Sequence, residues 1–172
     1  MDEHPDSLLQ QGYAIRCEWG PAAVAAIAPV CDVVVVIDVI SFTTCVDVAT
    51  ARGATIFPYR FRDATAADYA RERGALLAGE NPHGYSLKPS SLTSVEPGCR
   101  LVLPSPNGAV LSLATGDVTT LAGCLRNRTA VARHAAAHGG SLLVAPAGER
   151  WPHDGSLRPA FEDLWGAGAI VD

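Results

Sequence analysis

Acidic and hydroxyl side chains directly follow the most apolar stretch of the sequence. Residues 33–37 are four valines and an isoleucine, and Asp38, Ser41, Thr43 and Thr44 come next. Such an apolar run is typical of a parallel strand that is covered on both faces. Ligands of open α/β sheets bind in the crevice outside the carboxyl ends of the strands, where Asp38 would lie. Because a buried carboxylate is costly unless it is paired or metal-bound, we interpret Asp38 as functional.

Further polar side chains are expected at the same edge of the sheet. They follow the ends of four other predicted strands, at 75–78, 100–103, 118–122 and 141–145. Parallel connectivity would bring these ends together, so we expect one crevice that all of them line. The side chains concerned are Glu80, Ser105, Asn107, Cys124, Arg126, Asn127 and Glu149, with Gly148 beside the last of them.

The carboxylates among these residues suggest a metal site. Asp38 and Glu80 offer hard oxygen ligands, and Mg²⁺ takes few carboxylates while it keeps waters and phosphate oxygens. Asp163, next to Glu162, is a third candidate. For this pair the commoner explanation is structural, since the helix dipole stabilises acidic residues in a first helical turn.

Residues 105–108 read Ser-Pro-Asn-Gly at a predicted helix start. Free backbone amides point outward at such a start and can bind an anion. A plain turn with Asn107 as a cap explains the same residues equally well. Both interpretations stay open at this point.

Strands and helices alternate along the whole chain, which predicts an α/β fold: a three-layer α/β/α domain with a mostly parallel sheet. Residues 1–11 are expected to be a loose leader and residues 12–172 a single α/β domain, shortened at its C-terminal end. Two long irregular loops are expected, at 81–98 and 148–158. The predicted strands are 13–18, 31–39, 54–59, 75–78, 100–103, 118–122 and 141–145; the predicted helices are 21–27, 43–51, 63–73, 109–114, 127–138 and one from about 159.

Composition argues against several classes of partner. The 172 residues carry 13 basic and 18 acidic side chains, a net charge of −5, and Lys88 is the sole lysine. Nucleic acids and anionic membranes need a basic face, so neither is expected as a partner. No signal peptide or bilayer-spanning run is visible, and the five scattered cysteines form no CxxC pair, so we expect a cytoplasmic protein. The oligomeric state is open, with a homo-oligomer as one alternative.

Over residues 31–170 the order of these motifs resembles the 2-phosphosulfolactate phosphatase family (ComB-like proteins). Each motif is short, and the resemblance depends on their order and spacing. The similar segments are 36–40 with Thr43 and Thr44 (family VIDVLRATTT), 79–80 with 84–85 (GE…GF), 105–109 (T-x-N-G-T), Asn127 (an Asn before a helix), and 147–148 with 161–163 (AG…ED).

The resemblance implies a Mg²⁺-dependent phosphatase, a hydrolase that acts on the phosphate monoester of a small sulfonated or carboxylated hydroxy acid. It implies metal-binding or acid–base roles for Asp38, Glu80 and Asp163, with Asp38 and Glu80 as metal ligands. Asn107 and Gly108 become candidate phosphate contacts. Whether Asp38 is a ligand or a nucleophile is open. The remaining candidates for substrate binding are Ser41, Ser105, Arg126 and Asn127.

Two departures from the family pattern keep other functions open. Ser41 stands where the family has an arginine, the natural bidentate partner of a phosphate or sulfonate, unless Arg126 or Lys88 replaces it. The family run G-N-S-P reads Lys-Pro-Ser-Ser at residues 88–91. One alternative is therefore a non-catalytic member that binds a small anion or a partner protein. Another is a different hydrolase, with Cys124 or Ser105 as its nucleophile.

Overall fold

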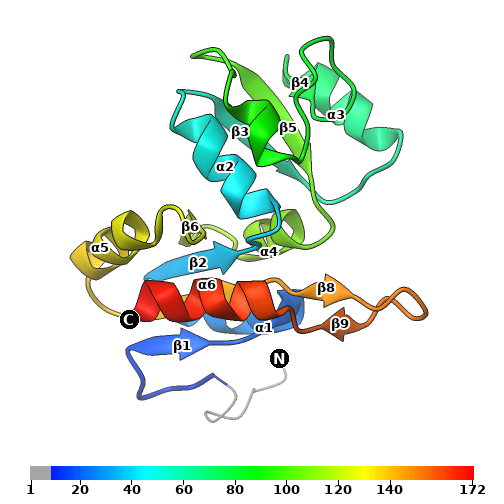
Figure 1. Ribbon diagram of the computed structural model, residues 1–172. Coiled ribbons are helices and arrows are strands. Elements are labelled where there is room, and N and C mark those ends of the chain that lie inside the picture. Colours follow the sequence, from blue (N-terminus) through cyan, green and yellow to red (C-terminus); the bar gives the residue numbers. More distant parts are fainter. Residues whose placement is uncertain (1–8) are drawn as a thin grey trace.

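Seven strands form two parallel sheets in the computed structural model, which describes residues 9–172 (Figure 1). Strands that are neighbours within each sheet run parallel, which confirms the α/β/α prediction, although the strands divide between two sheets instead of one. Pro58 has no N–H to donate, and its strand lies at the edge of the second sheet. In spatial order, sheet A is β1 (Ile15–Cys17), β7 (Leu142–Pro146), β2 (Val33–Ile37) and β6 (Thr119–Gly123), and sheet B is β3 (Thr55–Tyr59), β5 (Arg100–Pro104) and β4 (Leu76–Leu77).

Helices cover both faces of sheet A, which explains the unbroken apolar run of β2. Val34 and Val36 pack on the face under α1 and α4, while Val33, Val35 and Ile37 pack against α5 and α6. All five side chains are at most 1% exposed, and burying such a side chain is worth roughly 1.5–3 kcal/mol. The helices are α1 (Gly20–Ile27), α2 (Phe42–Thr50), α3 (Thr65–Glu72), α4 (Gly108–Ala114), α5 (Arg128–His138) and α6 (Phe161–Val171).

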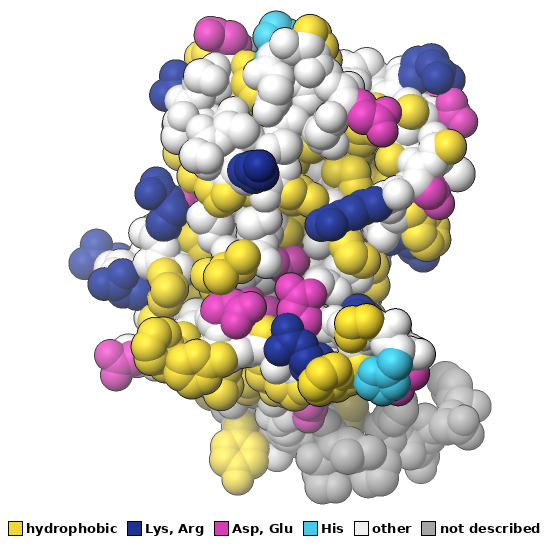
Figure 2. Space-filling view, turned by 45° about the vertical axis from the view of Figure 1, so that its right-hand side comes forward, with side chains coloured by type: hydrophobic (Ala, Val, Ile, Leu, Met, Phe, Trp, Pro, Cys, Tyr) yellow, Lys and Arg dark blue, Asp and Glu magenta, His cyan; other side chains and the backbone are white. Residues whose placement is uncertain are grey.

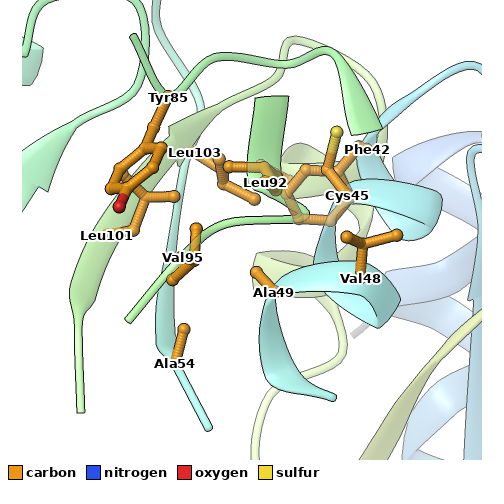
Figure 3. Close-up of a cluster of buried hydrophobic side chains, with 11 residues drawn as sticks. Phe42, Cys45, Val48, Ala49, Ala54, Tyr85, Leu92, Val95, Leu101 and Leu103 are labelled. Atoms are coloured by element: carbon orange, nitrogen blue, oxygen red, sulfur yellow. The ribbon is translucent and has the colours of Figure 1, made fainter. Parts of the chain in front are cut away.

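A second core joins α2 to sheet B and to the first long loop (Figure 3). Phe42 and Cys45 of α2 pack in one cluster with Leu101 of β5. The loop at 81–98 contains a short 3₁₀ helix, η2 (Pro89–Leu92), and both Leu92 and Val95 are fully buried. This loop is therefore packed onto the protein, although most of it is irregular, as predicted.

The second predicted loop is partly regular. Residues 148–158 contain a short antiparallel hairpin of β8 (Glu149–Arg150) and β9 (Leu157–Arg158), and the Trp151 N–H donates to the Ser156 carbonyl oxygen at 2.9 Å. The prediction of an irregular loop was wrong here because two-residue strands leave no periodic pattern in the sequence.

Two predictions about the chain as a whole are only partly covered by the structure. The predicted leader, residues 1–11, lies outside the described residues except for residues 9–11, and the single domain over 12–172 stays a prediction. Among the residues that the structure does describe, no helix combines the length and hydrophobicity that a bilayer crossing requires.

Candidate functional site

Asp38 follows β2 directly, and hydrogen-bond donors hold its carboxylate from both sides. The side chain is 6% exposed. Its Oδ1 accepts the Phe42 N–H at 3.2 Å, from the start of α2. Its Oδ2 accepts the Gly108 N–H at 2.8 Å and the Ser105 hydroxyl at 3.2 Å. The carboxylate therefore lies between the end of a sheet A strand and the segment that leaves sheet B.

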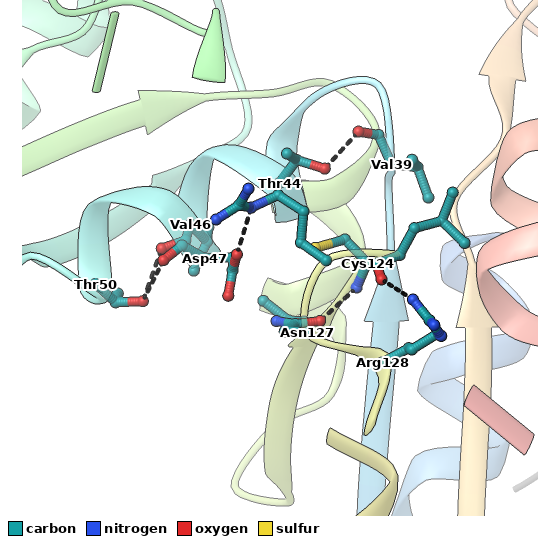
Figure 4. Close-up of polar contacts among 11 residues, drawn as sticks. Val39, Thr44, Val46, Asp47, Thr50, Cys124, Asn127 and Arg128 are labelled. Carbon is teal, nitrogen blue, oxygen red and sulfur yellow. Dashed lines mark hydrogen bonds and ion pairs between the residues drawn. The ribbon is translucent and has the colours of Figure 1, made fainter. Parts of the chain in front are cut away.

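The hydroxyl residues that follow Asp38 brace the turn between β2 and α2. Thr43 Oγ1 accepts the Asp38 N–H at 3.1 Å, and the Thr43 N–H donates to the Asp38 carbonyl oxygen at 2.9 Å. Thr44 Oγ1 donates to the Val39 carbonyl oxygen at 2.7 Å (Figure 4). Thr43 is fully buried. These contacts fix where the carboxylate of Asp38 lies at the end of its strand.

Burial raises the pKa of the Asp38 carboxyl above its ordinary value. The donors on Gly108, Phe42 and Ser105 act in the opposite direction because they stabilise the charged form, and so does the positive charge of Arg62. The carboxyl group therefore combines a low-dielectric environment with a rigid set of donors, which is a common arrangement at functional sites.

Asp38 lines a cavity of about 270 Å³ to which both sheets contribute. Asp38 and Glu149 follow strands of sheet A, whereas Arg62, Ser105 and Asn107 follow strands of sheet B. In Figure 2 the carboxyl ends of the sheet A strands are turned toward the reader, and acidic side chains gather at mid-height of this face. A cavity is thus present at the carboxyl ends of the strands, at the junction of the two sheets. Of the residues that follow the other predicted strands, Ser105, Asn107 and Glu149 line it, so the prediction that all of them share one crevice was wrong.

Asn107 has an amide group with one partner missing. Its Nδ2 donates to Glu149 Oε2 at 3.0 Å, which identifies the other atom as the carbonyl oxygen. That oxygen, Oδ1, is buried and has no hydrogen-bond partner within the described part of the chain. A buried acceptor without a partner is unfavourable, and such an atom is commonly satisfied by a water or an ion.

The Ser-Pro-Asn-Gly segment uses its amides within the protein. The Gly108 N–H binds Asp38, and the Asn107 N–H donates to Ser105 Oγ at 3.3 Å. The anion that this segment holds is therefore the carboxylate of Asp38. Gly108 is suited to this position because a Cβ there would lie only 2.7 Å from Asp38 Oδ2.

Asp163, in the first turn of α6, joins the ends of two sheet A strands. Its Oδ1 accepts the Val39 N–H at 2.8 Å, and its Oδ2 accepts the Gly148 N–H at 2.9 Å. Burial, together with the negative charge of Asp38, raises the pKa of the Asp163 carboxyl to about 7. Asp163 does not line the Asp38 cavity, so its visible contribution is to position the segments that do.

Glu80 lines a second cavity, of about 620 Å³, which adjoins the first. Arg62 and Leu87 line both cavities, whereas Asp38 lines only the smaller one. Glu80 is exposed. The two carboxylates predicted as a metal pair therefore belong to neighbouring cavities.

A model of the family described as 2-phosphosulpholactate phosphatase matches residues 23–172. The chain belongs to this family. The match spans the segments that hold Asp38, Asn107, Glu149 and Asp163, so it confirms the resemblance that the motif order indicated. No curated protein matches the sequence.

Ser41, predicted to stand where the family has an arginine, lines the Asp38 cavity. Its hydroxyl donates to the Leu87 carbonyl oxygen at 2.6 Å, so this side chain ties α2 to the first long loop. Lys88, one of the two predicted substitutes for the arginine, is exposed and does not line the cavity.

Arg126 and Asn127 lie after β6 and do not line the Asp38 cavity. Arg126 Nε pairs with Asp47 Oδ2 of α2 at 3.0 Å. Asn127 Oδ1 accepts the Cys124 N–H at 2.8 Å, and its Nδ2 donates to the Ala122 carbonyl oxygen at 2.9 Å. Both side chains stabilise the loop between β6 and α5.

Arg62 is not among the site residues predicted from the sequence. It is exposed, its Nε donates to the Pro104 carbonyl oxygen at 3.3 Å, and of the residues described it is the one basic residue that lines the Asp38 cavity. It follows the carboxyl end of β3. The other candidates were polar residues that follow the end of a predicted strand. Arg62 follows the predicted strand at 54–59, so the same criterion applies to it.

Proposed function

We propose that this member of the family hydrolyses the phosphate monoester of a small sulfonated or carboxylated hydroxy acid, with the help of Mg²⁺, in the Asp38 cavity. The observation that carries the proposal is the buried, rigidly held carboxylate of Asp38 beside Glu149 and the partnerless carbonyl oxygen of Asn107. The family match supports a phosphatase, and the oxygen donors support the metal.

The donor set fits Mg²⁺. Asp38, Asn107 and Glu149 offer two carboxylates and one amide oxygen, and Mg²⁺ prefers a few such ligands together with water and phosphate oxygens. No group of three His, Cys, Asp or Glu residues with metal-binding geometry occurs within residues 9–172, so the amide oxygen would be needed. Glu149 takes the place predicted for Glu80. When bound, Mg²⁺ polarises a phosphoryl group and orients the attacking group.

Groups of the protein itself hold the Asp38 carboxylate in place and offset part of the negative charge in the cavity. Donors from Phe42, Gly108 and Ser105 fix the orientation of Asp38, so little reorganisation is needed when a phosphate arrives. Asp38 and Glu149 would repel a phosphate dianion, and the guanidinium of Arg62 at the cavity wall offsets part of that repulsion.

The decisive test is phosphate release from a panel of small phosphoesters, measured with Mg²⁺ and with EDTA. We expect turnover by the wild type that requires Mg²⁺, and none by Asp38→Asn, which keeps the shape of the side chain but not its charge. Asp117→Asn, at an exposed position away from the cavity, is the matched control and should match the wild type. Unchanged turnover by Asp38→Asn would exclude this site. A phosphorylated Asp38 trapped during turnover would identify a nucleophile, and its absence a ligand.

A second candidate function has support from two observations. The amides of Asn107 and Gly108 are engaged by Ser105 and Asp38, and Ser41 binds Leu87, so several groups that would contact a substrate are already occupied. These contacts favour a non-catalytic member that binds a small anion or a partner protein. Thermal stabilisation by phosphoesters without any turnover across the panel would support this alternative.

A further inference from the structure

Arg62 has an anchored guanidinium with free donors. Its Nε is held by the Pro104 carbonyl oxygen, at the end of β5. No ion pair of Arg62 occurs among the residues that the structure describes, and its Nη atoms make no hydrogen bond there. A guanidinium that is fixed through Nε still presents two parallel N–H donors on its Nη atoms, which match the two oxygens of a carboxylate or sulfonate.

Arg62 also lies at a boundary. It lines both the Asp38 cavity, of about 270 Å³, and the adjoining cavity, of about 620 Å³. Leu87, the other shared residue, accepts the Ser41 hydroxyl through its carbonyl oxygen, so this side of the boundary offers an engaged acceptor and no charge. A group bound by Arg62 would lie at the boundary between the two cavities.

The linings of the two cavities hold four carboxylates, with Asp63 and Glu80 in the larger one, so Arg62 is the place where either lining can pair with an anionic group. The carboxylates of Asp38 and Glu149 and the free oxygen of Asn107 occupy the small cavity, where the proposed phosphoryl site lies. Arg62 is the one basic residue in the lining of either cavity within the described chain. Burial raises the pKa of Asp38, and the charge of Arg62 works against that shift, so its field reaches the small cavity.

We propose that Arg62 is a specificity-determining residue, which binds the carboxylate or sulfonate group of the substrate while the phosphate lies beside Asp38. The assignment rests on the proposed function, since it takes the phosphoryl site from there. Arg62, which follows β3, also supplies the guanidinium that Ser41, the residue before α2, does not supply. A substrate without the second anionic group would lose this contact and keep the phosphate contacts.

The test compares two esters that differ by one group. In 2-phospholactate a carboxylate stands where isopropyl phosphate has a methyl group. Binding of each is measured by calorimetry, in EDTA and again with Mg²⁺, on the wild type, Arg62→Gln, Arg62→Lys and Arg60→Gln. Arg60 is the matched control, because it is an exposed arginine two residues away that lines neither cavity.

We expect the wild type and Arg60→Gln to bind 2-phospholactate roughly 10-fold to 100-fold more tightly than isopropyl phosphate, the range for charge-assisted hydrogen bonds. Arg62→Gln should lose that preference while its affinity for isopropyl phosphate stays near the wild-type value. Arg62→Lys, which keeps the charge without the two-donor fork, should retain part of it. Thermal melts of the four proteins verify that each is folded.

Three results would overturn the assignment: equal affinity of the wild type for both esters, a preference that survives in Arg62→Gln, or equal weakening of both esters in that variant. Absence of measurable binding under both conditions would also overturn it. Because the binding measured in EDTA involves no turnover, failure of the phosphatase reaction leaves this comparison valid. The two proposals can therefore fail separately.

Discussion

The Oδ2 atom of Asp38 accepts a hydrogen bond from the backbone N–H of Gly108, 70 residues further along the chain, at 2.8 Å. Asp38 directly follows a strand of sheet A, and Gly108 begins the helix that follows a strand of sheet B. This one bond therefore connects the two sheets at the cavity, and it determines which way the carboxylate of Asp38 is held.

Substitution of Gly108 by alanine should damage both the fold and the site. The new Cβ would lie 2.7 Å from Asp38 Oδ2 and 2.5 Å from Phe42 Cδ1, so at least one of them must move. We expect a loss of roughly 1–3 kcal/mol in the free energy of unfolding, measured in urea, together with lower phosphatase activity. Gly168→Ala is the control, since a Cβ at that position would have no atom within 4 Å, and it should be neutral or gain up to about 1 kcal/mol. Wild-type stability of Gly108→Ala would contradict the close approach.

Asp163 should make stability fall as the pH rises through neutrality. Its pKa is about 7 in the folded protein, against an ordinary value of 3.8, so the unfolded chain loses this proton first. A raised folded pKa gives stability that is fully present below the ordinary value and is lost as the pH rises through the folded value. Between about pH 4 and pH 7 the free energy of unfolding should decline in the wild type and decline less in Asp163→Asn. Asp117→Asn, an exposed carboxyl that does not act on Asp163, should keep the wild-type slope, and equal slopes in all three proteins would refute the assignment.

Glu149, and not Glu80, should be the second carboxylate of the proposed metal site. Glu149 lines the Asp38 cavity and binds Asn107, whereas Glu80 lines the adjoining cavity. We expect Glu149→Gln to weaken Mg²⁺ binding roughly tenfold or more, measured by calorimetry without substrate. Glu80→Gln is the matched control and should bind Mg²⁺ like the wild type. The reverse result would restore Glu80 as the ligand.

Alkylation of the folded protein should spare Cys45 and Cys124. Cys124 and Cys45 are fully buried, and burial raises the pKa of Cys45 to about 11, so this thiol stays protonated and unreactive. After treatment with iodoacetamide, mass spectrometry should find both unmodified, with phosphate release unchanged. Inactivation that accompanies modification of Cys124 would instead support the cysteine hydrolase that the sequence leaves open.

Local patterns were sufficient for most of the elements and for the central carboxylate. The apolar run at 33–37 predicted β2 and the position of Asp38, because a strand covered on both faces leaves an unbroken hydrophobic signal. The predicted residues Ser41, Ser105 and Asn107 line the Asp38 cavity, while Arg126 and Asn127 do not. A strand end predicts an edge of a sheet, but the pairing of the strands decides which ends share a cavity.

The sequence by itself determined the alternating strands and helices and the carboxylate at the end of the most apolar strand, since both depend on residues that are close together in the chain. It also determined the family, through the order and spacing of short motifs. Only the tertiary structure decided that the strands form two sheets, that Gly108 holds Asp38, and that Glu149 and Arg62 join it while Glu80 lines the adjoining cavity. Strand pairing, the Gly108–Asp38 hydrogen bond and the lining of each cavity all depend on contacts between segments that are far apart in the sequence. The hydrophobic periodicity of a segment does not indicate which distant segment it will contact.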